Sequence, residues 1–338
     1  MSAWKRAGLV VGVLGAAVGA GLAAERVVAA RLRKADDPDG AEDLVAEFDT
    51  SWRIPSHDGG ELYVVERGRG PVIVLSHGVT LSVQVWAKQL RSLADAGFRV
   101  IAFDHRGHGA STVGHAGHAV ENLGADLRSV IEALDLQDVV IVGHSMGGVA
   151  ALSFWLQFPD EARERVAGIV LLSSLARSIL SGNPRIASAS TWLADRLPDG
   201  AAALRARDLG LVLARLGFGR NPLPSHIEAT RQMILATDPA TRREAVAALA
   251  GLDLTNRLGE IDRPTLVICG TADLITPLAE SRRMARRIRG ARLEVIDGGG
   301  HMLMFERSAV VDDLIVGFAR EVQSAGRADA GSVAVVPG

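Results

Sequence analysis

Residues 139–152 read VVIVGHSMGGVAAL. This stretch constrains the possible folds of the chain more than any other. Apolar residues run up to Gly143, Ser145 follows, and a helical pattern begins at once. The neighbouring glycines, 147 and 148, indicate a turn in which side chains have little room. Ser145 is therefore either an ordinary turn residue or a nucleophile held on a sharp strand-to-helix turn.

Composition excludes several classes of protein. The 338 residues are 48% hydrophobic and 22% charged, which is typical of a globular chain. A net charge of −2 offers no basic surface, so no nucleic-acid partner is expected. Glycine loops of the nucleotide-binding kind are absent, and the single cysteine, Cys269, lies in the apolar run PTLVICG. We therefore expect no cofactor and no metal, and Cys269 is expected in the core.

Short apolar runs alternate with helical patterns through most of the chain. Buried strands separated by helices predict a mostly parallel, doubly wound α/β sheet with helices on both faces. The expected strands are residues 61–68, 72–78, 99–107, 139–143, 167–174, 264–270 and 292–297.

The interval from Leu175 to Asn256 breaks this alternation, because it has helical patterns and no strand signal. An interval of about eighty residues is too long for a loop in a compact domain, so a helical cap is expected here. The predicted division of the chain is an anchor at 1–35, a linker at 36–47, core at 48–174, cap at 175–256, core at 257–323 and a disordered tail at 324–338.

The beginning of the chain has a different character. Residues 7–24 carry no charge, and basic residues flank them on both sides. Eighteen helical residues extend about 27 Å, close to the hydrocarbon thickness of a bilayer. We predict a single-pass membrane helix on an unknown side of the membrane. The alternative is a cleaved signal peptide and a secreted protein.

The C-terminal part of the chain contains two possible partners for Ser145. Asp273 comes just after the expected strand 264–270, and His301 just after the strand 292–297. Carboxyl ends of parallel strands meet at one edge of a sheet, so the three side chains should lie together. A serine hydroxyl needs a base to take its proton, and a histidine base needs a carboxylate to orient it. Asp297 is the competing carboxylate, four residues before His301.

The chain resembles the α/β-hydrolase superfamily over about residues 50–322. Five motifs carry the resemblance in the order of the family: SHGVTLS at 76–82, FDHRGHGAS at 103–111, GHSMGG at 143–148, GTADLITP at 270–277 and GGGHMLMFE at 298–306. The resemblance implies an α/β-hydrolase fold in which Ser145 is the nucleophile, Asp273 the orienting carboxylate and His301 the base and then the acid.

The resemblance also implies the remaining parts of the site. The backbone N–H groups of Val79 and Met146 would stabilise the oxyanion. Independently of the resemblance, Trp86 is a candidate for lining an acyl pocket, although a tryptophan at the start of a helix is at least as often a core residue. Haloalkane dehalogenases and epoxide hydrolases carry aspartate where this chain has Ser145, which argues against both.

We therefore predict a carboxylesterase or lipase-like enzyme that acts through an acyl-enzyme on a small ester with an apolar acyl group. A lactonase, a carbon–carbon bond hydrolase and a cofactor-free perhydrolase remain alternatives, as does a ligand receptor built on the same fold.

Overall fold

The computed structural model describes residues 26–40, 42–178 and 202–331. Within this part of the chain, eight strands form one sheet in the order β1-β2-β4-β3-β5-β6-β7-β8. Strands β3 to β8 pair in parallel, whereas β2 is antiparallel to both β1 and β4. The strands are β1 (Thr50–Pro55), β2 (Glu61–Arg67), β3 (Val72–Ser76), β4 (Arg99–Phe103), β5 (Val139–His144), β6 (Val166–Leu172), β7 (Thr265–Gly270) and β8 (Arg292–Ile296). The predicted mostly parallel sheet is confirmed, and β1 is a strand that the sequence pattern did not predict.

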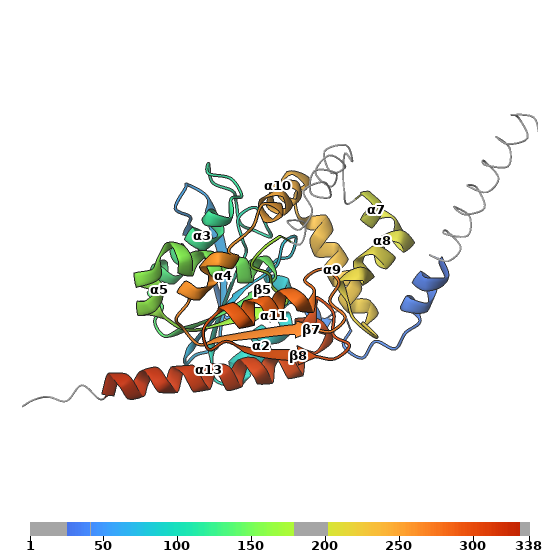
Figure 1. Ribbon diagram of the computed structural model, residues 1–338. Helices are drawn as coiled ribbons and strands as arrows, with labels where there is room; N and C mark the ends of the chain where they lie inside the picture. Colours follow the sequence, from blue (N-terminus) through green and yellow to red (C-terminus); the bar gives the residue numbers. More distant parts are fainter. Residues whose placement is uncertain (1–25, 41, 179–201, 332–338) are drawn as a thin grey trace, which may run out of the picture.

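Helices cover both faces of this sheet (Figure 1). They are η1 (Glu42–Leu44), η2 (Val83–Trp86), α2 (Ala87–Asp95), α3 (Val120–Ala133), α4 (Met146–Gln157), α5 (Pro159–Arg165), α11 (Leu278–Arg287), α12 (Leu303–Glu306) and α13 (Ser308–Gly331). Neighbouring residues of β5 belong to different core clusters: Val140 packs with residues of α2 and α13, and Ile141 with residues of α3 and α4. Because successive side chains of a strand point to opposite faces, a strand buried on both sides must be apolar throughout.

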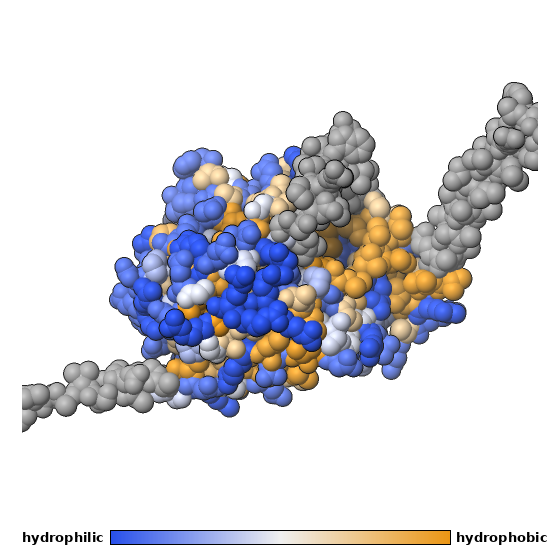
Figure 2. Space-filling view, viewed as in Figure 1, coloured by the Kyte–Doolittle hydropathy of each residue, from blue (hydrophilic) through white to orange (hydrophobic). Residues whose placement is uncertain are grey.

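Between β6 and β7 the described residues form helices beyond one end of the sheet (Figure 1). These are α7 (Ala202–Arg205), α8 (Arg207–Ala214), η3 (Arg215–Gly217), α9 (Pro224–Ala236) and α10 (Pro239–Ala250). The last helix before β7, η4 (Thr255–Glu260), packs against α4 and α11 of the core. Ala245 of α10 packs with Met146, so this helix lies over the turn that carries Ser145. Figure 2 shows hydrophobic surface over α8, in contrast to the hydrophilic surface over α11. Residues 179–201 of the predicted cap lie outside the described residues, and the division into domains stays a prediction.

The predicted membrane helix is corrected by the structure. No helix among the described residues is long and apolar enough to cross a bilayer. The uncharged segment 7–24, on which the prediction depended, lies outside the described residues. Residues 26–33 were assigned to the anchor but form a helix that packs on protein. Ala29 is fully buried, and Arg33 forms an ion pair of 2.5 Å with Asp208 of α8.

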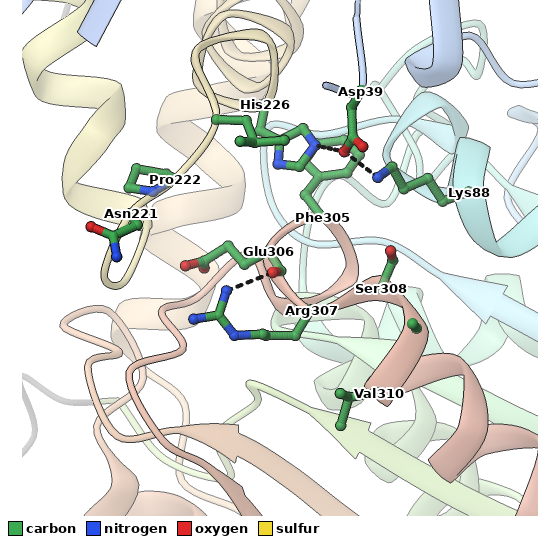
Figure 3. A pocket seen from close by; sticks show the side chains of 12 residues that line it. Asp39, Lys88, Asn221, Pro222, His226, Phe305, Glu306, Arg307, Ser308 and Val310 are labelled. Atoms are coloured by element: carbon green, nitrogen blue, oxygen red, sulfur yellow. Dashed lines mark hydrogen bonds and ion pairs between the residues drawn. The ribbon is translucent and has the colours of Figure 1, made fainter. Parts of the chain in front are cut away.

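The polar stretch after this helix is attached to the folded protein. The Asp37 carboxylate accepts hydrogen bonds from the N–H and the hydroxyl of Ser225, at 2.7 and 2.8 Å, in the first turn of α9. A negative charge is favourable at this end of a helix. Asp39 accepts a hydrogen bond of 2.7 Å from His226 and pairs with Lys88 of α2, as Figure 3 shows. The segment predicted to be a linker thus joins a helix beyond the sheet edge to a helix of the core.

A buried arginine holds three segments of the core together. The guanidinium of Arg106, only 1% exposed, donates hydrogen bonds to Asp126 of α3 and to Asp58 in the turn between β1 and β2. Burial acts to raise the pKa of Asp58, but hydrogen bonds from Arg106 and Ser56 outweigh it and lower the pKa. The Asp58 carboxylate is therefore ionised, and both carboxylates bond the same buried cation.

Replacing Arg106 by leucine should lower the free energy of unfolding by about 3–5 kcal/mol, because two buried carboxylates lose their cation. Urea unfolding followed by circular dichroism measures this change. Arg163→Leu is the matched control, since Arg163 pairs with Asp262 at the surface, where ion pairs contribute little. Equal losses in the two variants would contradict a stabilising role for the buried cluster.

Candidate active site

Ser145 occupies a strained turn between β5 and α4. Its backbone has φ 52° and ψ −115°, a region that residues with a side chain rarely adopt. A Cβ on Gly143 would overlap the carbonyl oxygen of Gly147, and a Cβ on Gly147 would overlap that of Ser76 at the end of β3. The two glycines therefore allow the turn to pack directly against the neighbouring strand.

The loop after β3 passes close to this turn. A Cβ on Gly78 would lie 3.2 Å from the Cβ of Ser145 and 2.8 Å from Nδ1 of His144. Nδ1 of His77 donates a hydrogen bond of 2.7 Å to the carbonyl oxygen of Gly78. Because that carbonyl and the Val79 N–H point in opposite directions from one planar peptide, the bond also fixes the direction of the Val79 N–H.

Met146, the residue after Ser145, carries the second backbone N–H that was predicted to stabilise the oxyanion. It is the first residue of α4, and its side chain is buried. N–H groups in the first turn of a helix have no partner within the helix and lie at the positive end of its dipole. The two N–H groups predicted for the oxyanion thus come from the residue after Ser145 and from the loop beside it.

Asp273 and His301 form a buried pair. Nδ1 of His301 donates to Oδ2 of Asp273 at 3.0 Å. The carboxylate also accepts hydrogen bonds of 2.8 Å from the N–H groups of Ile275 and Thr276. Burial acts to raise the pKa of Asp273, but the adjacent His301 and the bonds from Thr276 outweigh it and lower the pKa. An ionised carboxylate therefore faces the imidazole and fixes its tautomer.

Asp297, the competing carboxylate, lies elsewhere. Its side chain is 81% exposed, accepts a hydrogen bond from Thr271 and pairs with Arg220. The structure thus places Asp273, and not Asp297, against His301.

His144 connects the serine turn to the loop of His301. Its Nε2 donates a hydrogen bond of 3.0 Å to the carbonyl oxygen of His301, and the two rings lie 4.7 Å apart. Within the described part of the chain, no hydrogen bond joins the Ser145 hydroxyl to the His301 ring. Such bonds often tighten only when substrate is bound.

Thr276 is a contributor that sequence reasoning missed. Its hydroxyl donates to Asp273 at 2.7 Å and lies 3.2 Å from Nδ1 of His301. The spacing Asp-x-x-Thr was the available signal, because an aspartate side chain commonly accepts from the backbone two or three residues further on.

Trp86 is fully buried, and its ring is perpendicular to that of His144, with the ring centroids 6.4 Å apart. Its role in binding an acyl group stays a prediction. The cavity in Figure 3 has a volume of about 380 Å³ and lies beside Phe305 and His226. Its lining does not include Ser145, Asp273 or His301.

Another group of side chains, outside this site, has ligand atoms close enough together to hold a metal ion. It consists of His57, Asp58 and Asp126. Arg106 already bonds both carboxylates and supplies the positive charge that a metal ion would bring. Their donor set therefore fits Arg106 better than a metal ion.

Comparison with known proteins identifies the family. The family model described as alpha/beta hydrolase fold matches residues 71–308. A non-heme chloroperoxidase of Kitasatospora aureofaciens is 31% identical, over 73% of this chain and 90% of that protein. A bifunctional esterase/perhydrolase of Acinetobacter calcoaceticus is 26% identical, over 79% of this chain and 99% of that protein. The structure of a thermophilic esterase from Thermogutta terrifontis has 30% identity and a TM-score of 0.69, with 81% of this chain and 100% of that one covered.

The residues matched include the serine turn and the segments that carry Asp273 and His301. The chain therefore belongs to the alpha/beta hydrolase family of enzymes.

Proposed function

We propose that this protein is a serine hydrolase that cleaves small carboxylic esters through an acyl-enzyme. The observation that carries the proposal is the buried pair of Asp273 and His301, whose side chains lie 3.0 Å apart. The loop of His301 is in turn bonded to His144, the residue before Ser145. A serine held at positive φ at a helix N-terminus, beside an oriented imidazole, is suited to nucleophilic attack.

In the proposed reaction, Oγ of Ser145 attacks the ester carbonyl while Nε2 of His301 takes the hydroxyl proton. Asp273 holds the Nδ1–H and stabilises the imidazolium that forms. The N–H groups of Val79 and Met146 donate to the oxyanion of the tetrahedral intermediate.

Collapse of that intermediate expels the alcohol, which receives the proton from His301 and leaves an acyl group on Ser145. Water then attacks the acyl group while His301 takes its proton. Release of the acid returns the proton to Ser145.

A second candidate reaction differs only in the attacking molecule. If hydrogen peroxide replaces water in the second half, the same acyl-enzyme gives a peracid. The relatives named chloroperoxidase and esterase/perhydrolase favour this candidate.

Ser145→Ala should reduce kcat on p-nitrophenyl esters roughly 10⁴-fold or more, because the nucleophile is lost while the oxyanion donors remain. A fluorophosphonate probe should label wild type at Ser145 and leave this variant unlabelled. Ser129→Ala is the matched control, since this hydroxyl only bonds the backbone of α3. Labelling at another serine would refute the assignment. A wild type that is neither labelled nor active would favour a ligand receptor.

Asp273→Asn should lower kcat by about 10⁴-fold, because the amide does not hold the required tautomer of His301. Asp297→Asn removes the same charge from an exposed position, so its kcat should stay close to that of wild type. Steady-state kinetics on one acetyl ester compares the two variants. Equal impairment, or the reverse order, would contradict the choice of Asp273.

Hydrogen peroxide added to an acetyl ester should divert part of the acyl-enzyme to peracetic acid if perhydrolysis occurs. The peracid is measured by its oxidation of iodide, with the Ser145→Ala variant as the blank. Acetic acid as the sole product formed from the acyl group, at every peroxide concentration, would exclude the second candidate.

A further inference from the structure

The chain between α8 and α9 lies directly against the loop that carries His301. The N–H of His301 donates to the carbonyl oxygen of Gly217 at 3.0 Å, and the N–H of Arg220 donates to that of Gly298 at 2.7 Å. A Cβ on Gly219 would overlap the carbonyl oxygen of Gly298, and a Cβ on Gly300 would overlap the amide nitrogen of Gly219. The two segments, 217–220 and 298–301, therefore meet backbone to backbone, and glycine makes the contact possible.

One carboxylate binds an amide from each of these segments. Oε2 of Glu306 accepts a hydrogen bond of 2.7 Å from the N–H of Gly219. The N–H of Gly300 donates to Oε1 at 3.1 Å and also lies 3.3 Å from Oε2. Figure 3 shows this side chain pointing toward the loop of Asn221 and Pro222. Only an ionised carboxylate accepts on both oxygens without donating, and bonds from N–H groups to an anion are stronger than neutral ones.

The nearby arginines leave this carboxylate free for the two amides. The guanidinium of Arg307 donates to the backbone carbonyl of Glu306, and Arg220 pairs with Asp297. Glu306 itself is half-buried, and burial raises the pKa of its carboxyl group. A half-buried carboxylate satisfied by backbone amides keeps a fixed geometry better than one paired with a long, exposed side chain.

We propose that Glu306 is a positioning residue for His301, which it holds by binding the Gly300 amide to the segment 217–220. The proposal rests on the proposed function, in which His301 is the general base. Glu306 acts through the backbone, because Gly300 immediately precedes His301 and the Gly217 carbonyl accepts from His301 itself. The segment 217–220 thereby sets the position of the His301 imidazole relative to Asp273 and Ser145.

Glu306→Gln tests this role at nearly constant volume. The amide oxygen still accepts, but the NH₂ group takes the place of the other oxygen and faces an N–H, so either the 3.1 Å bond from Gly300 or the 2.7 Å bond from Gly219 is lost. We expect kcat per active site to fall roughly tenfold to a hundredfold, since small misplacements of a catalytic group have effects of this size. KM should change little, because no substrate contact is removed. Fluorophosphonate titration counts the active sites, which separates a slower site from a smaller folded fraction.

Glu294→Gln is the matched control, because Glu294 is exposed on β8 and the change removes the same charge nearby. Hydrogen exchange should show faster exchange in peptides covering 217–220 and 298–301 of the Glu306 variant, with β5 still protected. A purely structural role would lower the thermal midpoint and leave kcat per active site unchanged, and this result would overturn the proposal.

Two further measurements keep the test decisive. If Glu306→Gln does not fold, Glu306→Asp takes its place, since a carboxylate one methylene shorter does not reach both amides in the same geometry. Wild-type kcat per active site in that variant would overturn the proposal. If wild type is inactive and unlabelled at Ser145, the proposed function fails. The exchange of residues 298–301 then still reports whether Glu306 holds this loop.

Discussion

The close packing of the β5–α4 turn against β3 is the constraint on which the rest of the site depends. The turn can approach the end of β3 only because Gly143 and Gly147 have no side chain, and this approach holds Ser145 at positive φ. The same contact brings Gly78, in the loop after β3, next to the serine. The position of the proposed nucleophile and that of the proposed oxyanion donors therefore have one physical origin.

The loop of His301 is built by the same means. A Cβ on Gly270, at the end of β7, would overlap the carbonyl oxygen of Gly299, and Gly300 meets Gly219 from beyond the sheet edge. His144 and Glu306 then fix this loop through its backbone, one from the serine turn and one from the end of α12. Backbone contacts made possible by glycine locate the groups proposed to react, and a few polar side chains hold them there.

At the beginning of the chain, charged side chains make contacts that segment patterns do not reveal. Residues 36–47 were predicted to be a linker because they are polar, yet Asp37 and Asp39 bond Ser225, His226 and Lys88. Residues 26–33 were assigned to a membrane helix, yet Ala29 is buried against protein. A polar sequence looks the same whether water or another part of the protein satisfies its charges, and only the contact distinguishes the two.

Local patterns in the sequence determined the alternation of strands and helices, the helical interval between β6 and β7, and the serine turn with its glycines. Each of these depends on neighbours within a few residues, so periodicity and glycine spacing suffice to predict it. The same patterns placed Asp273 and His301 at strand ends. Only the tertiary structure decided the contacts between distant segments. Asp297 faces solvent, whereas Thr276 contacts both Asp273 and His301. Glu306 accepts a hydrogen bond from the N–H of Gly219, which is 87 residues away in the sequence. The sequence alone could not determine these contacts, because side-chain direction and loop approach depend on how the whole sheet packs.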